Sequence, residues 1–256
     1  MLKVENVTKM FGGLAAVSDV SVEFEAGRIN AIIGPNGAGK STFFNLISGL
    51  HQPTSGRILL DGVDVTNLPS DRVARLGVGR TFQTTNLFEQ ATVLDNLIVG
   101  HRLRTKSGLW DVLINSKRLQ REEKAARDKA MEALEFVGLA HVAGQFIADI
   151  TQEERKRVAF ALALATDPKI VLLDEPAAGV NPEETVGFAA LMRKMVDEKG
   201  LTVCLIEHKM DMIMSLADKI MVLDHGEKIA ERTPEEVRNN PVVIEAYLGG
   251  DEDAAA

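Results

Sequence analysis

The sequence predicts an α/β fold in which a mostly parallel sheet carries an N-terminal antiparallel β-subdomain and an inserted helical subdomain. Three observations support this prediction. Two runs with strand-like alternation, Leu2–Val7 and Val17–Phe24, open the chain around a glycine turn. A stretch rich in Lys, Arg, Glu, Ala and Leu follows at Lys117–Val137 and is typical of a helix. Short β-rich apolar runs then alternate with helical segments, which is the pattern of a parallel sheet.

The first half of the chain is expected to contribute two further strands and one helix. After the antiparallel pair, the apolar run Ile29–Ile33 predicts a strand, and Thr42–Leu50 is compatible with a helix. Arg57–Leu60 predicts a further strand that enters a tight turn at Asp61 and Gly62.

The second half returns to the sheet after a helical region. Thr151–Ala165 predicts a helix that ends at Asp167-Pro168, because proline cannot continue it. The later strands are expected at Ile170–Leu173, Thr202–Ile206 and Ile220–Leu223, with helices at Pro182–Glu198 and Met210–Ala217.

These elements predict a domain organisation. Residues 1–83 and 168–248 are expected to form the α/β core. Residues 84–167 are expected to form the helical subdomain, inserted into that core, and residues 249–256 a flexible tail.

Composition and charge limit the classes of protein. Hydrophobic content of 45% and charged content of 26% are typical of a soluble globular protein. The run Val158–Ala165 is too short to cross a bilayer, and the N-terminus lacks the apolar core of a signal peptide. Cys204 is the single cysteine and lies in a strand-like run, so a buried thiol in a reducing compartment is expected. The net charge of −8 argues against a nucleic-acid partner.

The strongest motif is a glycine-rich loop. It reads Gly34, Pro35, Asn36, Gly37, Ala38, Gly39, Lys40 and Ser41, and Thr42 follows it. The order of strand, loop and helix is the context that a phosphate loop requires, and an ordinary glycine turn would not explain it. Such a loop turns its N–H groups and a helix N-terminus toward phosphates. Lys40 supplies a positive charge for the β- and γ-phosphates, and the Ser41 hydroxyl suits Mg²⁺. The sequence therefore predicts binding of a nucleoside triphosphate.

Two carboxylates end a predicted buried strand. Asp174 and Glu175 follow Ile170–Leu173, at the end of a parallel strand where ligands bind. Asp174 is expected to hold Mg²⁺ through water, and Glu175 to orient or deprotonate the attacking water. A strand ending in Asp-Glu is common, and the phosphate loop is what favours a catalytic interpretation over a solvated strand end.

Two further residues have open interpretations. His208 ends the strand Thr202–Ile206 after Glu207, and can either reach the γ-phosphate or be a surface histidine. Gln83 lies where the core meets the insert. Its amide can contact Mg²⁺ or the attacking water, and a solvated loop glutamine is the alternative.

Together these residues resemble the ATPase subunit of ATP-binding cassette transporters, over nearly the whole chain. The resemblance implies that the Phe11 ring stacks on adenine. It also implies that Gly34–Thr42 is the phosphate loop and that Gln83 belongs to the glutamine loop. Asp174-Glu175 would end the strand that carries the Mg²⁺ carboxylate, and His208 would be the histidine switch. Finer features are similar to the ATPases of branched-chain amino acid importers, namely Gly79–Gln83, Asp174–Pro182, Ile206–His208, Arg238–Pro241 and Ala246–Gly249.

The resemblance also implies partners and a location. Such subunits bind ATP and Mg²⁺ as peripheral proteins on the cytoplasmic face of the inner (plasma) membrane. They pair with a second ATPase subunit, usually a different chain, and drive two membrane permease subunits, with a periplasmic or extracellular solute-binding protein as an indirect partner. Leu87 and Phe88 are expected either to form a groove for a permease helix or to pack in the core. The solute is not specified, because its contacts belong to other subunits.

One segment departs from the family pattern. Where the family has a Leu-Ser-Gly-Gly-Gln-like signature, this chain has Ile150–Glu154. Thr151 keeps a hydroxyl and, with Glu154, fits a helix capping box, so a well-capped helix start is the plain alternative. Glu153 replaces the glycine that approaches the γ-phosphate, and two like charges about 4 Å apart cost about 4 kcal/mol at an effective dielectric of about 20. Arg155–Arg157 can offset part of this. Thr151 and Glu153 are expected at the partner's ATP, in a site that turns over slowly.

Three other functional classes are alternatives to this interpretation. A P-loop kinase would not need a long helical insert or a strand ending in Glu207 and His208. A non-transport cassette acting on nucleic acid would carry long coiled coils or two cassettes in one chain. A regulatory module with weak hydrolysis is made plausible by Glu153, but Asp174 and Glu175 argue against a pure sensor.

Overall fold

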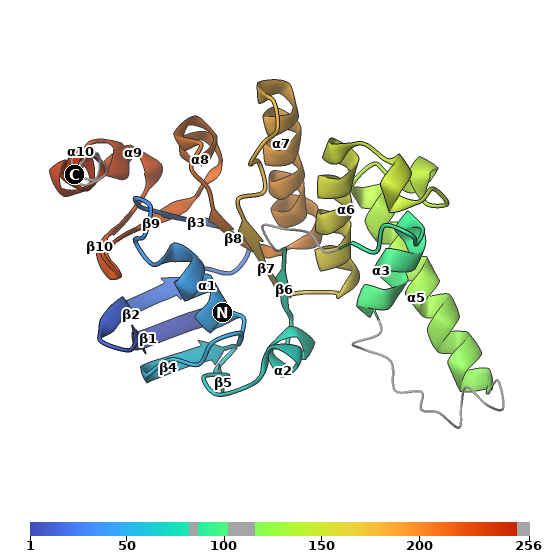
Figure 1. Cartoon of the computed structure of the whole chain (residues 1–256), viewed down its shortest axis with the longest axis horizontal. Helices are drawn as coiled ribbons and strands as arrows, with labels where there is room; N and C mark the ends of the chain where they lie inside the picture. Colours follow the sequence, from blue (N-terminus) through green and yellow to red (C-terminus); the bar gives the residue numbers. More distant parts are fainter. Residues whose placement is uncertain (82–86, 102–115, 250–256) are drawn as a thin grey trace. The chain divides into compact units, whose positions relative to one another are not determined.

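The computed structural model describes residues 1–81, 87–101 and 116–249 (Figure 1). Contacts divide the chain into two compact units. One unit holds Met1–Val78 together with the chain from Lys169 onward, and the other holds Gly79–Pro168. Within the described ranges, no helix combines the length and apolar character needed to cross a bilayer.

The N-terminal sheet is antiparallel, as predicted. Its strands are β1 (Leu2–Phe11), β2 (Leu14–Phe24), β4 (Ser55–Leu60) and β5 (Val63–Asp64), in the spatial order β2-β1-β4-β5. Both strands of the first pair are longer than the sequence suggests. Positive φ values of 48° at Asn6 and 50° at Asp19 accompany shifts in the β1–β2 register, after which pairing resumes. These irregularities interrupt the alternation that a strand prediction relies on.

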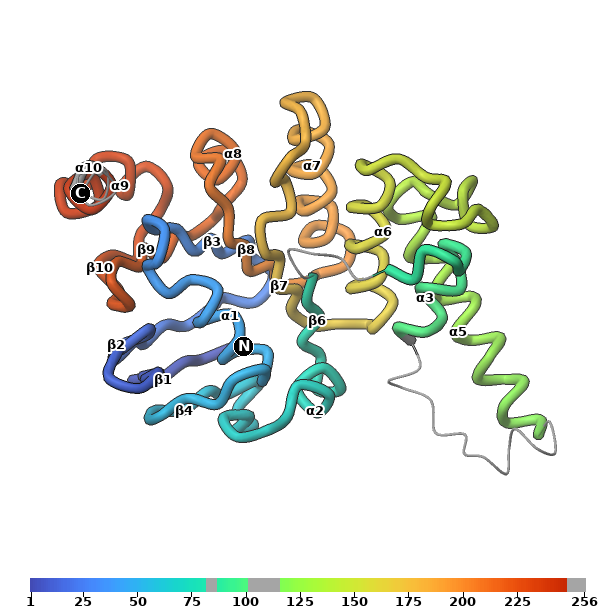
Figure 2. The backbone as a smooth tube through the Cα atoms, viewed as in Figure 1, coloured from blue at the N-terminus to red at the C-terminus, as the bar shows by residue number. Residues whose placement is uncertain are grey.

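The second sheet is mostly parallel, which confirms the predicted α/β class. Its strands are β3 (Ile29–Ile33), β6 (Val78–Arg80), β7 (Ile170–Asp174), β8 (Thr202–Ile206), β9 (Lys219–Asp224) and β10 (Glu227–Arg232), in the spatial order β10-β9-β3-β8-β7-β6. β3 pairs in parallel with β8 and β9, although they are far apart in sequence (Figure 2). Every residue of β3, β7 and β8 is buried, as expected for parallel strands covered on both faces.

Helices and the N-terminal sheet cover the two faces of the parallel sheet. The helices of the first unit are α1 (Lys40–Ile47), α2 (Ser70–Arg75), α7 (Pro182–Lys199), α8 (Met210–Leu216), α9 (Pro234–Arg238) and α10 (Pro241–Gly249). Ile32 of β3 packs in one core with α1 and the antiparallel sheet. Its neighbours Ala31 and Ile33 point to the other face and pack with α8, α9 and α10. Because successive side chains of β3 point to opposite faces of the sheet, this one strand contributes to both hydrophobic cores.

The second unit is helical, as expected for the insert. Its described elements are α3 (Val93–His101), α5 (Lys117–Phe136), α6 (Gln152–Ala165) and two short 3-10 turns, Ala140–Val142 and Ile147–Asp149. The three helices contact one another pairwise. Ser116 caps α5 by accepting a hydrogen bond from the Leu119 N–H at 3.2 Å, and α6 begins with the predicted capping box at Thr151.

Candidate functional site

The glycine loop between β3 and α1 requires glycine at three positions, at two of them because no Cβ would fit. A Cβ at Gly34 would lie 2.0 Å from the Leu223 carbonyl oxygen, and a Cβ at Gly39 would lie 2.3 Å from that of Ala16. Gly37 has a φ of +82° but no neighbour within 4 Å, so conformation alone requires glycine there. The loop backbone therefore packs closely against neighbouring backbone at Gly34 and Gly39, whereas the space around Gly37 is open.

The loop leads into a helix N-terminus suited to an anion. α1 follows Gly39 without a side-chain cap and without an acidic residue in its first turn. Its first N–H groups therefore have no acceptor from such a side chain, and the helix dipole adds partial positive charge. Ser41 is exposed in that turn. The backbone at this point suits phosphate groups.

The Lys40 ammonium lies on the loop itself. Nζ donates to the carbonyl oxygens of Gly34 at 2.7 Å and Pro35 at 2.8 Å, and the side chain is buried. Burial lowers the pKa of Lys40, while the carboxylates of Glu175 and Asp174 act in the opposite direction. A phosphate would supply a stronger acceptor than a carbonyl and would further favour the charged ammonium.

The predicted catalytic residues converge at the same edge of the sheet. Asp174 ends β7, and it is paired in register with Ile206 of β8, which is also paired with Ile32 of β3. The ends of the three strands, and so the loop, the carboxylates and the histidine, lie at one edge. Glu175 Oε1 lies 3.1 Å from Nε2 of His208. The backbone of Glu175 has a φ of 49° and donates its N–H to the Ile206 carbonyl oxygen at 2.9 Å.

The donor set at this edge fits Mg²⁺ bound together with a nucleotide. Within the described part of the chain, no group of three or more His, Cys, Asp or Glu side chains could hold a metal ion alone. Ser41 and Asp174 offer a hydroxyl and a carboxylate oxygen, and Mg²⁺ commonly takes one or two such ligands plus phosphate oxygens and water. Gln83, the third expected ligand, lies outside the described residues.

Phe11 ends β1 with an accessible ring. Its exposed fraction is 45%, its ring meets that of His51 edge-on at 5.6 Å, and the Lys9 ammonium lies 5.1 Å from its centroid. An aromatic ring held in place at the surface is suited to stacking on a base.

The altered signature segment forms a capping box at the start of α6. Thr151 Oγ1 accepts from the Glu154 N–H at 3.2 Å, and Glu154 accepts from the Thr151 N–H at 2.8 Å. That second bond is the main cause of the lowered pKa of Glu154. Glu153 Oε1 accepts from Nε of Arg157 at 2.8 Å, one turn along α6. Arg157, one of the three basic residues expected to offset Glu153, therefore pairs with it.

Comparison with known proteins decides the family. A family model described as "ABC transporter" matches residues 17–178, and one described as "Branched-chain amino acid ATP-binding cassette transporter" matches residues 227–253. This chain belongs to the ABC transporter family. It is an ABC-type transport ATPase with the cassette fold.

The individual relatives cover the whole cassette. The chain is 41% identical to the high-affinity branched-chain amino acid transport ATP-binding protein BraF of Pseudomonas aeruginosa, over 97% of this chain and 98% of BraF. Among solved structures, the ADP conformation of an ABC transporter cassette superposes with a TM-score of 0.85 at 34% identity, covering 97% of this chain and 98% of that one. A dimeric post-hydrolysis cassette bound to ADP and Pi has a TM-score of 0.76 at 27% identity, covering 91% and 99%.

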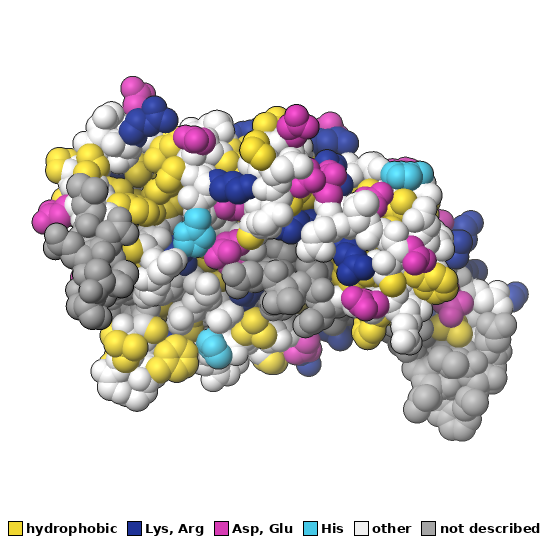
Figure 3. All heavy atoms as spheres, turned by 45° about the horizontal axis from the view of Figure 1, so that its top comes forward, with side chains coloured by type: hydrophobic (Ala, Val, Ile, Leu, Met, Phe, Trp, Pro, Cys, Tyr) yellow, Lys and Arg dark blue, Asp and Glu magenta, His cyan; other side chains and the backbone are white. Residues whose placement is uncertain are grey.

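The C-terminal helix of this ABC ATPase contributes a residue that sequence reasoning missed. On α10, Val243 is buried, whereas Val242 and Ile244 are exposed. Hydrophobic side chains are visible on the surface of the molecule in Figure 3. Tyr247 packs against the core that contains Ile33, and the backbone of Gly34 acts on its hydroxyl to lower its pKa. Burial raises the pKa of Tyr247 to about 12, so its hydroxyl is neutral at ordinary pH. Its signals in the sequence were that it is the single tyrosine and that it lies in the family-like ending Ala246–Gly249, neither of which indicated a place beside the phosphate loop.

We expect the substitution Tyr247→Phe to weaken ATP binding about two- to tenfold, because the hydroxyl acts on the backbone of Gly34 in the phosphate loop and one neutral polar contact is worth about 0.5–1.5 kcal/mol. The ring would still fill its place in the core, so the thermal midpoint should change little. Titration with a fluorescent ATP analogue measures the affinity. Ile244→Ala, on the exposed side of the same helix, is the matched control, and equal affinities for both variants would refute the role of the hydroxyl.

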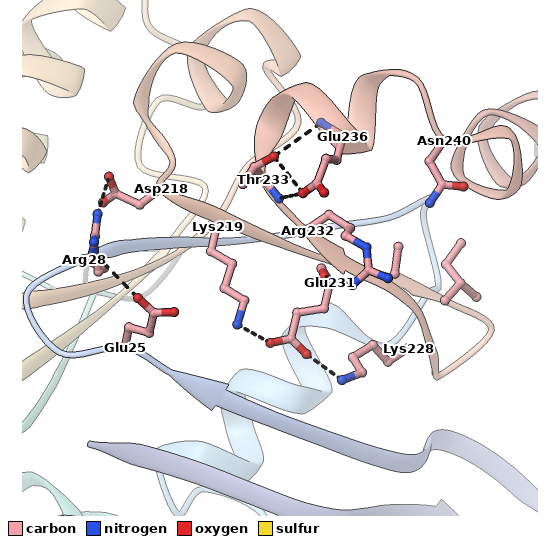
Figure 4. A pocket seen from close by; sticks show the side chains of 12 residues that line it. Glu25, Arg28, Asp218, Lys219, Lys228, Glu231, Arg232, Thr233, Glu236 and Asn240 are labelled. Atoms are coloured by element: carbon pink, nitrogen blue, oxygen red, sulfur yellow. Dashed lines mark hydrogen bonds and ion pairs between the residues drawn. The ribbon is translucent and has the colours of Figure 1, made fainter.

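The first unit also has a hollow of about 840 Å³ beside β9, β10 and the loop before β3 (Figure 4). Its charged side chains are largely paired with one another. Glu231 accepts from the ammonium groups of Lys219 and Lys228, each at 2.6 Å, and Arg28 pairs with Asp218 at 3.7 Å. These lysines lower the pKa of Glu231 against the opposing effect of its burial, which is the largest single contribution. The pairing gives the hollow no net charge with which to select a ligand.

Proposed function

We propose that this chain hydrolyses ATP to power an importer for branched-chain amino acids or a related small solute. The observation that carries the proposal is the convergence of the phosphate loop, Asp174, Glu175 and His208 at one edge of the parallel sheet. The similarity to BraF over nearly the full length supports the solute class. The proposed domains are a core of residues 1–83 and 168–248 and a helical subdomain of residues 84–167; beyond Gly249, the predicted tail lies outside the described residues.

In the proposed mechanism, the loop and Lys40 bind the triphosphate and Phe11 stacks on adenine. Lys40 would exchange its bonds to the Gly34 and Pro35 carbonyls for bonds to phosphate oxygens, so the loop is prepared for the anion before it arrives. Ser41, Asp174 and Gln83 would hold Mg²⁺, which supplies positive charge at the phosphates.

Glu175 would take a proton from the attacking water while His208 holds its carboxylate. The 3.1 Å contact between His208 Nε2 and Glu175 Oε1 holds the carboxylate beside His208. Loss of the γ-phosphate would remove the contacts of His208 and Lys40 that favour a closed pair of subunits. The work available is the difference in ATP affinity between open and closed pairs.

The proposed partners are a second ATP-binding subunit of a different sequence, two membrane permease subunits and, indirectly, a solute-binding protein, with the chain on the cytoplasmic face of the membrane. The dimeric relative supports pairing between cassettes. Phe88 is 62% exposed, so the expectation that it packs in the core is wrong for this residue. Its backbone is fixed by Asn96, which accepts from the Phe88 N–H at 2.8 Å. An exposed aromatic ring on an anchored backbone supports a permease contact.

The test is purification of the intact membrane complex with its subunits identified. Leucine, isoleucine or valine, presented with the solute-binding protein, is expected to stimulate its ATPase activity. Stimulation by urea or short amides instead would move the assignment to a related importer. An assembly without permease subunits would contradict the transport role.

We further propose that the two ATP sites of the pair are unequal because of Glu153. The ion pair with Arg157 neutralises much of its charge, so the bulk of the side chain is the main obstacle to the partner's γ-phosphate. In a complex whose other site is silenced by Glu175→Gln, Glu153→Gly is expected to raise the remaining ATPase rate about threefold or more, since about 1 kcal/mol of relieved repulsion corresponds to fivefold.

Glu235→Gly is the matched control for this experiment. Glu235 occupies the same second position of a helix that begins with a Thr capping box and is exposed on α9. It therefore reproduces the effect of glycine on the helix start without a place in the predicted site. No gain from Glu153→Gly would mean that the altered signature is harmless, and the case for unequal sites would end.

A further inference from the structure

The segment between β7 and α7, residues 175–181, carries the proposed catalytic carboxylate but has little regular structure of its own. Glu175 and Gly179 have positive φ values of 49° and 68°. The local backbone bonds are single turns, from the Ala178 N–H to the Glu175 carbonyl at 3.1 Å and from the Val180 N–H to the Ala177 carbonyl at 3.5 Å. Its geometry must therefore depend on contacts from neighbouring elements.

Glu207 provides one of these contacts from the end of β8. The residue is 3% exposed. Its Oε1 accepts from the Ala177 N–H at 2.7 Å, in the middle of the segment. Its Oε2 accepts from the N–H groups of His208 at 2.9 Å and Lys209 at 3.3 Å. A buried carboxylate with N–H donors on both oxygens forms strong, directional bonds. Glu207, at the end of β8, is thus bonded to Ala177, two residues after Glu175.

Lys209 provides a second contact, two residues further along. Its ammonium donates to the Val180 carbonyl at 3.0 Å and to the Thr185 hydroxyl at 2.8 Å. Thr185 in turn donates to the Asn181 carbonyl at 2.8 Å. The ammonium thus binds the end of the segment and the first turn of α7. A cation there opposes the helix dipole, so general helix stability does not explain its position.

His208 lies in the chain between these two anchors. Glu207 holds the middle of the segment and Lys209 holds its end, while the segment's first residue, Glu175, meets His208 at 3.1 Å. We propose that Glu207 and Lys209 are positioning residues, which clamp residues 175–181 to the end of β8 and thereby keep the Glu175 carboxylate on His208. This inference rests on the proposed catalytic role of Glu175.

The clamp makes a prediction that a purely structural role does not. Neither residue contacts the phosphate loop in the bonds described, so ATP binding should survive its loss while the chemical step suffers. We expect Lys209→Met in the assembled complex to lower kcat about tenfold or more, because small displacements of a catalytic group are costly. The KM for ATP should stay within about twofold, and the thermal midpoint should move by no more than about 4 °C, the effect of about 1 kcal/mol.

Three further variants complete the experiment. Lys209→Arg keeps a cation that can reach both acceptors, and should recover most of the rate. Thr185→Val removes one acceptor, and in combination with Lys209→Met its effect should be less than additive. Lys194→Met, on a more exposed part of α7, is the matched control and should leave kcat unchanged.

The possible outcomes separate this inference from the proposed function. A wild-type complex without ATPase activity would overturn the proposed function. An active wild type, with Lys209→Met unchanged in kcat, would overturn the clamp alone. A loss of kcat that is accompanied by an equal rise in KM or by a large fall in the thermal midpoint would assign Lys209 to folding and would also overturn the clamp.

Discussion

Replacing Lys40 by alanine should reduce ATP turnover by about 100-fold or more, the typical cost of removing a preorganised group that stabilises charge in the transition state. The ammonium is held at 2.7 and 2.8 Å by the carbonyls of Gly34 and Pro35, so it is already placed beside the predicted phosphate position. Steady-state phosphate release from the assembled complex measures the rate. A fluorescent nucleotide titration should show weaker ATP binding in the same variant.

Two variants separate loss of charge from collapse of the loop. Lys40 is buried, so alanine would also leave a gap and two carbonyl groups without their donor. Lys40→Met keeps the apolar stem and should lose nearly as much turnover as alanine. Lys3→Ala, which removes an exposed lysine of β1, should leave turnover unchanged. If Lys40→Met kept most of the wild-type rate, the charge would have no major role at the phosphates.

The elements predicted from sequence were those with strong local patterns. β3, β7 and β8 are mainly apolar and fully buried, and α7 spans Pro182–Lys199 almost as expected. α7 has local signals at both ends. Asn181 and Glu184 form a capping box with Pro182 at the first position, and Gly200 closes the helix with a φ of 64°. Such signals act within a few residues, so they can be read without the rest of the fold.

Other elements lacked such a pattern or had one that was overlooked. β10 consists largely of polar residues, because an edge strand needs few buried side chains. α9 is only Pro234–Arg238, but it starts with a Thr233 and Glu236 capping box that could have revealed it. The helix after the glycine loop begins at Lys40, not Thr42, because backbone geometry sets its start.

The candidate site also combines residues that local sequence predicts with contacts that it does not predict. The phosphate loop and Asp174 to Glu175 follow from local sequence and the strand-end rule. The bond from the Ala177 N–H to Glu207 and the packing of Tyr247 against the core of Ile33 join residues that are distant in sequence. No periodicity or motif encodes such a pair, because it depends on how the strand ends and the last helix meet. These contacts became visible only with the fold.

Replacing Glu175 by glutamine should abolish most turnover while ATP stays bound between closed subunits. Glutamine has nearly the same shape but cannot accept a proton from water, and general base catalysis contributes about 10²–10⁴-fold. The change should not disturb the fold. The Glu175 N–H bond to the Ile206 carbonyl belongs to the backbone, and a glutamine side chain can still bond His208 Nε2.

The closed state expected for Glu175→Gln is more informative than its loss of turnover. If ATP affinity favours the closed pair and hydrolysis ends it, then blocking hydrolysis should accumulate the closed state. Size-exclusion chromatography of Glu175→Gln with its partner cassette in excess Mg-ATP should show a stable pair that disperses when Mg²⁺ is chelated. Glu235→Gln, an exposed change of the same type on α9, should show neither effect. Monomeric Glu175→Gln protein in excess Mg-ATP would separate ATP binding from closure, and the proposed coupling would then need another source of energy.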